Sequence, residues 1–165
     1  MSTSFGKLLR RLADAEVEFI LVGGLAANAH GSARVTTDVD VSYGRSAANL
    51  ERIVKALAPI KPYLRGAPPG LPFDWSAATL RAGLNFTLIT TDGSLDLLGE
   101  IVGGGTYDDL LPHSPVARAF DRDIRVLELS ALIRAKRAAG RPKDLEVLAE
   151  LEALQEEAIA RERSR

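Results

Sequence analysis

The stretch Thr36-Thr37-Asp38-Val39-Asp40-Val41 places two aspartates one residue apart at the start of a strand-forming run. Alternate residues of a strand point to the same side of a sheet, so this spacing aims both carboxylates into one small volume. Two like charges that close raise each other's pKa and are costly to keep ionised. A divalent cation removes that cost, and Mg²⁺ prefers hard oxygen ligands together with substrate phosphates. Taken alone, such a pair is more typical of a polar strand edge or an N-capping turn than of a metal site.

A glycine pair upstream favours the metal interpretation. Phe19-Ile20-Leu21-Val22 is apolar and rich in β-branched and aromatic residues, which predicts a buried strand ending at Gly23-Gly24. Residues 25–30 are small and favour a helix, with Gly31 as its C-cap. Glycines at a helix start expose amide groups, and the positive end of a helix attracts phosphate. A metal site beside a phosphate site indicates chemistry on a nucleoside triphosphate.

Hydrophobic periodicity along the rest of the chain predicts helices and strands in mixed order. The predicted helices cover residues 5–15, 46–57 with Ser46 as cap, 76–80, 130–140 with Ser130 as cap, and a last helix capped by Asp144 with Leu145, Leu148, Leu151 and Leu154 facing inward. The predicted strands cover residues 39–43, 124–129, and a hairpin of 85–90 and 94–98. This order predicts an α+β or α/β fold, a small mixed β-sheet with packed helices, in one domain over 1–165 with C-terminal helices at about 130–160.

Composition narrows the function classes. The 165 residues suffice for one domain with a real core, and the absence of cysteine excludes disulfides, thiolate zinc sites and cysteine nucleophiles. No signal peptide and no apolar run of about 18 residues is evident, so we expect a cytoplasmic protein without a membrane partner. The net charge of −1 argues against a strongly basic nucleic-acid binder, although a local patch would still allow RNA binding.

A third carboxylate is the next requirement of a phosphoryl-transfer metal site. Asp96 is the candidate, because it lies between apolar residues on the predicted strand 94–98. A carboxylate there is costly to bury without a cation or a hydrogen-bond donor. The alternative is an ordinary solvent-facing strand residue, since alternation leaves one face of a strand polar.

These residues resemble a known signature. Val22-Gly23-Gly24-Leu25-Ala26 followed by Arg34-Val35-Thr36-Thr37-Asp38-Val39-Asp40-Val41 is similar to that of the nucleotidyltransferase (polymerase-β-like) superfamily, in which a later strand carries a third aspartate. Within it the chain resembles the small bacterial minimal-nucleotidyltransferase and AbiEii-like toxin groups. Residues 135–145 also resemble a stretch common in those groups, and the likeness covers about residues 17–150.

The resemblance implies a nucleotidyltransferase-like fold and a set of metal ligands. Asp38, Asp40 and Asp96 would hold two Mg²⁺ ions, and Asp96 would orient or deprotonate the incoming hydroxyl. Gly23 and Gly24 would let the backbone approach the β- and γ-phosphates.

Three basic residues complete the implied nucleotide site. Arg34 would neutralise phosphate charge, and its alternative is a surface arginine. Lys136 and Lys143 would close over the triphosphate, although basic residues near helix ends more often serve only the helix dipole.

The function implied by this resemblance is Mg²⁺-dependent transfer of NMP from an NTP to a protein or RNA acceptor, as part of a toxin–antitoxin system. Leu25 stands where the superfamily often has a serine, which supports an alternative, a non-catalytic module that binds a nucleotide or a partner protein. A metal-dependent phosphatase or nuclease also uses paired aspartates, but the preceding glycine pair speaks against it.

Overall fold

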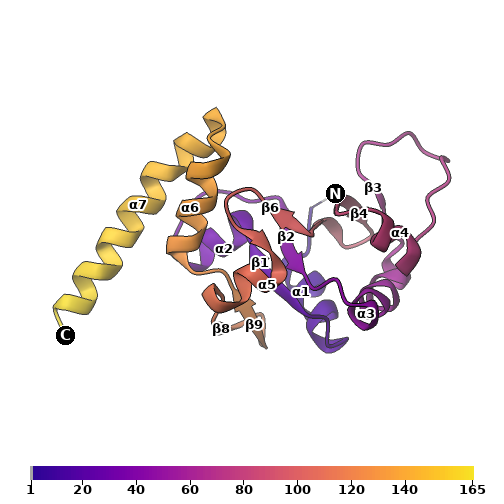
Figure 1. Cartoon of the computed structure of the whole chain (residues 1–165), viewed down its shortest axis with the longest axis horizontal. Helices are drawn as coiled ribbons and strands as arrows, with labels where there is room; N and C mark the ends of the chain where they lie inside the picture. Colours follow the sequence, from indigo (N-terminus) through magenta and orange to yellow (C-terminus); the bar gives the residue numbers. More distant parts are fainter. Residues whose placement is uncertain (1) are drawn as a thin grey trace.

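The fold is built on one mixed β-sheet, which a computed structural model describes for residues 2–165 (Figure 1). Its seven strands lie in the order β3-β4-β5-β2-β1-β9-β8. The β2–β5 and β1–β9 pairs are parallel and the other neighbours are antiparallel. The strands are β1 (Phe19–Val22), β2 (Asp38–Tyr43), β3 (Tyr63–Leu64), β4 (Asn85–Thr90), β5 (Gly93–Leu98), β8 (Val116–Ala119) and β9 (Arg122–Val126), with a separate ribbon of β6 (Glu100–Ile101) and β7 (Gly105–Thr106).

Helices of different lengths connect and flank these strands (Figure 1). They are α1 (Phe5–Asp14), α2 (Gly23–Ala29), α3 (Ala47–Leu57), α4 (Ala77–Ala82), α5 (Tyr107–Leu110), α6 (Leu129–Ala139) and α7 (Pro142–Arg163), with short 3₁₀ turns at Ala58–Ile60 and Leu111–His113. No helix within residues 2–165 is long and apolar enough to span a membrane.

The two central parallel strands have one apolar face and one polar face. Val39 and Val41 of β2 and Leu95 and Leu97 of β5 are fully buried. They share one core with the leucines of α1 and α3, which repeat at helical spacing. Because successive side chains of a strand alternate, burying these four residues turns the aspartates between them to the opposite face. The hydrophobic pattern thus places the acidic residues.

The two C-terminal helices close the other end of the molecule. A small second cluster joins Ala27 of α2, Ile133 of α6 and Leu151 of α7. Helix α7 extends away from the sheet and carries the C-terminus to the edge of the molecule (Figure 1). The long helix is therefore attached through its N-terminal half.

Several predicted boundaries are confirmed and others are wrong. Helices α1 and α3, strands β1 and β2 and the β4–β5 hairpin lie within a few residues of their predicted ranges, and Ser46 Oγ caps α3 by accepting from the Asn49 amide at 3.1 Å. Strand β9 ends at Val126 rather than residue 129, because Glu128 in extended conformation begins α6. Ser130 consequently lies inside that helix instead of capping it.

The last helix also differs from its prediction. Its N-cap is Arg141, and Asp144 is the third helical residue, whose carboxylate reaches back to the Arg141 amide at 3.2 Å. Leu145 is 54% exposed rather than inward, because Leu151 lies on the face that meets α2 and α6. Helical order continues to Arg163.

Candidate functional site

Three aspartates share the polar face of the two central parallel strands. Asp38 and Asp40 lie on β2, and Asp96 lies on β5. The strands are in register so that Asp40 is directly paired with Asp96 and Asp38 with Ser94. Residues paired in this way point to the same side of the sheet. The structure therefore brings together all three acidic residues that the sequence singled out.

The Asp40 carboxyl lies in an unusual electrostatic environment. Burial is the main cause that raises its pKa, to about 7, and the neighbouring charge of Asp96 and a hydrogen bond with that residue add to the rise. Asp38 acts in the same direction, whereas the positive charge of Lys136 opposes it. The protein thus holds a carboxyl group whose charge its own residues do not balance.

Arg65 contacts two of these aspartates, although no local pattern in the sequence predicts it. Its Nη2 donates to Asp96 Oδ1 at 2.5 Å, and its Nη1 lies 3.6 Å from Asp38 Oδ1. The arginine directly follows the edge strand β3, 31 positions before Asp96. Only the sheet order, with β4 between β3 and β5, makes the contact possible.

The oxygen donors fit a hard divalent cation. Carboxylate oxygens are the ligands that Mg²⁺ selects, and a cation would relieve the repulsion that raises the Asp40 pKa. Over residues 2–165, however, no three acidic or histidine side chains are arranged as a ready metal site. The chemistry of the donors fits the ion, while their present orientation includes an ion pair to Arg65.

The glycine pair lies directly against the aspartates. Gly23 has a φ of +67°, and a Cβ at this position would overlap the Asp40 carboxylate. A Cβ on Gly24 would come within 2.6 Å of Thr36 Oγ1. Only glycine therefore lets the chain turn from β1 into α2 so close to the acidic residues.

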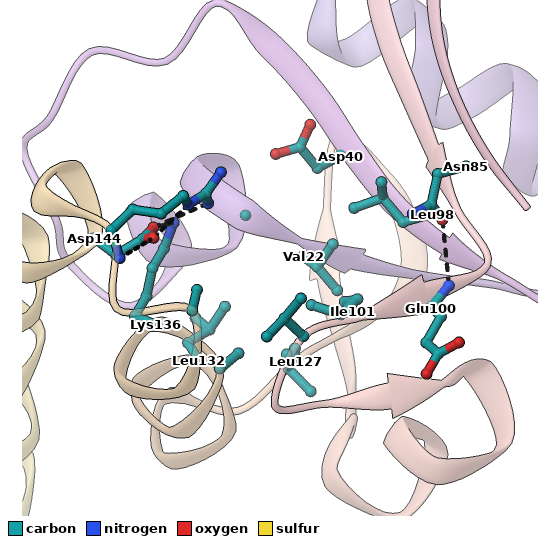
Figure 2. Close-up of a pocket in the computed structure, with 15 residues that line it drawn as sticks. Val22, Asp40, Asn85, Leu98, Glu100, Ile101, Leu127, Leu132, Lys136 and Asp144 are labelled. Carbon is teal, nitrogen blue, oxygen red and sulfur yellow. Dashed lines mark hydrogen bonds and ion pairs between the residues drawn. The ribbon is translucent and has the colours of Figure 1, made fainter.

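A cavity of ≈400 Å³ opens beside Asp40 (Figure 2). Helix α6 contributes Leu132, Ala135, Lys136 and Ala139, a spacing that places all four on one helix face. The apolar side chains of the remaining wall come from β1, β5, β6 and the loop residues Val102 and Leu127. The other lining residues are Val22, Gly23, Asn85, Leu98, Glu100, Ile101, Val102, Leu127, Arg141 and Asp144.

A second carboxylate, Asp144, lines the same cavity across from Asp40 (Figure 2). It is fully buried, but Arg141 Nε donates to it at 2.6 Å and Lys136 Nζ at 3.3 Å. These contacts, with Arg141 contributing most, lower its pKa to about 2. Asp144 is thus ionised and fully balanced by the protein.

The predicted nucleotide-binding residues lie in different places. Gly23, Gly24, Arg34 and Lys136 all line a smaller cavity of ≈240 Å³, which shares Gly23, Leu132 and Lys136 with the larger one. Arg34 is engaged there, because its Nε donates to Glu150 at 2.8 Å. Lys143 is exposed at the start of α7 and lines neither cavity.

Solved structures share this architecture. The lincosamide antibiotic adenylyltransferase LnuA superposes with a TM-score of 0.60 at 14% identity, covering 93% of this chain and 99% of that one. The fold is that of nucleotidyltransferases. TM1012 of Thermotoga maritima, assigned as a nucleotidyltransferase, gives 0.54 at 16% identity, with 87% of this chain and 89% of that one covered. The antibiotic-resistance factor ANT(2'')-Ia gives 0.50 at 19% identity, with coverage of 96% and 90%.

Sequence comparison adds nothing to these structural matches, since no family model and no curated protein sequence matches the chain. The predicted fold class is confirmed, and the fold is the one expected from the resemblance to nucleotidyltransferases.

Proposed function

We propose that the protein is a metal-dependent nucleotidyltransferase that transfers NMP from an NTP to an acceptor hydroxyl. The observation that carries the proposal is the direct pairing of Asp40 with Asp96 on adjacent parallel strands, beside a glycine turn that admits no side chain. The likeness of the fold to nucleotidyltransferases supports it.

The reaction is an in-line displacement at the α-phosphorus. A bond forms between the acceptor oxygen and that phosphorus, the bond from the α-phosphorus to the bridging oxygen breaks, and pyrophosphate leaves with the electron pair. The hydroxyl proton passes to a carboxylate, for which Asp96 is placed beside Asp40. Two Mg²⁺ ions held by Asp38, Asp40 and Asp96 would supply charge neutralisation at the attacking and leaving oxygens.

The remaining residues would bind and orient the triphosphate. Gly23 and Gly24 leave open backbone beside Asp40, where phosphate oxygens can approach the chain. Lys136 lines both cavities, and its ammonium group, which is paired with Asp144 at 3.3 Å, would have to turn toward the phosphates. Arg34 would have to exchange its pairing with Glu150 for phosphate, and Lys143 would have to move toward the site.

The proposal is tested by label transfer. The protein is incubated with each NTP labelled at the α-phosphate, with Mg²⁺, and with candidate protein and RNA acceptors. We expect transfer by the wild type and a loss of at least about 10³-fold in D38A/D40A, because removing metal ligands removes most of the charge stabilisation. Equal transfer by both proteins contradicts the proposal.

The acceptor is the finer part of this proposal. The resemblance to minimal-nucleotidyltransferase and AbiEii-like groups leads us to a toxin–antitoxin setting with a protein or RNA acceptor. A specific observation favours a second candidate, a small amphipathic molecule with a hydroxyl group. The ≈400 Å³ cavity beside Asp40 is largely apolar, of a size that suits a small ligand, and LnuA is a lincosamide adenylyltransferase.

A substitution that fills the cavity separates the two acceptor classes. Ala135 lies on the cavity wall, so A135W reduces the space in the cavity while leaving every aspartate of the site in the chain. Transfer to a small hydroxylated acceptor then falls, while transfer to a protein or RNA end that binds outside the cavity is unchanged.

A non-catalytic binding module on the same fold remains the alternative. Leu25 is largely buried and offers no hydroxyl to a phosphate at the glycine turn, which favours this possibility. Calorimetry with NTP and Mg²⁺ distinguishes it, since binding without turnover supports the module and absence of NTP binding contradicts both functions.

A further inference from the structure

Arg65 connects the edge of the sheet to its acidic centre. Its backbone amide donates to Thr87 O at 2.9 Å and so prolongs the β3–β4 pairing by one residue. Its side chain crosses β4, where Nη1 lies 3.5 Å from Leu88 O, and reaches β5 and β2. The guanidinium is thus held at a defined place by backbone contacts as well as by carboxylates.

The contacts of the guanidinium are with two of the three proposed metal ligands. It makes a short hydrogen bond to Asp96 at 2.5 Å and an ion pair with Asp38 at 3.6 Å. The Arg65 side chain is only 30% exposed, so water screens these charges less than it would on an open surface. A single positive charge therefore stabilises the site that a divalent cation would occupy.

The arrangement of the three carboxylates is consistent with a guanidinium group standing in place of a metal ion. Asp38, Asp40 and Asp96 share one face of two paired strands, yet the described residues contain no metal-ready group of three. An Asp96 oxygen that accepts a short charge-assisted hydrogen bond is already committed to the arginine.

We propose that Arg65 is a resident counter-cation of the aspartate site, which a divalent metal ion must displace from Asp96 and Asp38 before these residues become ligands. The inference rests on the proposed function for the identity of the ligands. It assigns Arg65 a competing role: the arginine stabilises the metal-free protein and weakens metal binding.

The test is Mn²⁺ binding by the full chain, followed by calorimetry and by the electron paramagnetic resonance signal of free Mn²⁺. R65Q removes the charge, and R65K retains a cation with a shorter reach. R118Q is the matched control, because Arg118 forms an exposed ion pair with Asp123 on the β8–β9 hairpin. We expect R65Q to bind Mn²⁺ about tenfold more tightly than the wild type, R65K to fall between them, and R118Q to match the wild type.

A second readout requires no metal. Without Mn²⁺, R65Q should melt at a lower temperature than the wild type. In a protein that already carries D96N, adding R65Q should lower the melting temperature much less, because the two substitutions delete the same pair. Equal or weaker Mn²⁺ binding by R65Q overturns the inference, since the arginine would then merely position Asp96.

The outcomes also separate this inference from the proposed function. Tighter Mn²⁺ binding by R65Q in a protein that transfers no nucleotide supports the inference and contradicts the enzyme. If R65Q binds Mn²⁺ as the wild type does and the protein transfers nucleotide, the inference is contradicted and the proposed function is supported. Absence of Mn²⁺ binding in every variant contradicts both.

Discussion

Asp40 and Asp144 line the same cavity, yet the protein treats the two carboxylates in opposite ways. Asp144 receives hydrogen bonds from Arg141 and Lys136, and its pKa falls to about 2. Asp40 faces burial and two further aspartates, and its pKa rises to about 7. The negative charge of Asp144 is neutralised by cationic side chains of the protein, whereas that of Asp40 requires a bound cation.

This difference in charge balance indicates different roles for Asp144 and Asp40. A carboxylate with its own arginine and lysine stabilises the joint between α6 and α7, because it fixes the first turn of the long helix. A carboxylate whose charge is uncompensated stores unfavourable electrostatic energy, which binding of a cation releases. Three substitutions test this division, in order of decreasing effect.

D144N should cause the largest loss of stability. The amide cannot balance Arg141 and Lys136, so we expect a loss of about 3 kcal/mol in the free energy of unfolding at neutral pH. The folded pKa lies below the ordinary value of 3.8, so the contribution of Asp144 is present above that pH and is lost as the pH falls toward about 2. Chemical unfolding at pH 7 and pH 2 checks this, and a loss of equal size at the two pH values would contradict it.

K136Q should weaken nucleotide binding, and it should also lower stability because Lys136 is one of the two cations paired with the buried Asp144. Lys136 lines both cavities, so its removal should raise the KM for NTP about tenfold, a change of about 1.4 kcal/mol. K143Q is the control, because Lys143 is exposed outside both cavities. Steady-state kinetics measure both variants, and an equal change in the two would show that only overall charge matters.

D40N should have the smallest effect on stability and the opposite sign to D144N. The folded pKa of Asp40 lies above its ordinary value, so stability falls as the pH rises from about 4, where the unfolded carboxyl ionises, to about 7, where the folded one does. The neutral amide avoids this cost. We expect a gain of about 1 kcal/mol, or roughly 3 °C in Tm, at pH 8 without metal, shrinking toward pH 5.

Thermal melts at the two pH values, with EDTA present, measure the effect of D40N. A loss of stability at pH 8 would mean that the Asp40 carboxylate is already balanced within the metal-free protein.

The sequence predicts the centre of the site well because its signals are local. The alternation in residues 38–41 and 94–97 determines which side chains are buried, and the glycine pair ends an unmistakable apolar run. Alternation also puts Asp40 and Asp96 on one face once both runs share a sheet, whereas their direct pairing depends on the register of the two strands.

The elements and residues around the central strands are harder to predict from the sequence, because contacts between distant parts of the chain determine their positions. Strand β8 has four exposed or half-exposed residues, so no hydrophobic alternation marks it. Arg65 reaches the aspartates only through the order of the strands. Leucine spacing in α7 suggests an inward Leu145, but only part of the helix meets a neighbour.

The alternation of valines or leucines with aspartates in β2 and β5 has a consequence for misfolding. If β2 moved by one residue against its neighbours, Asp38 and Asp40 would enter the apolar interior beneath α1 and α3, while Val39 and Val41 would meet water. Burying two unpaired carboxylates in that way is prohibitively unfavourable. The acidic residues therefore also act as a safeguard against wrongly aligned strands, so replacing them with neutral residues weakens the penalty that keeps the sheet in its correct alignment.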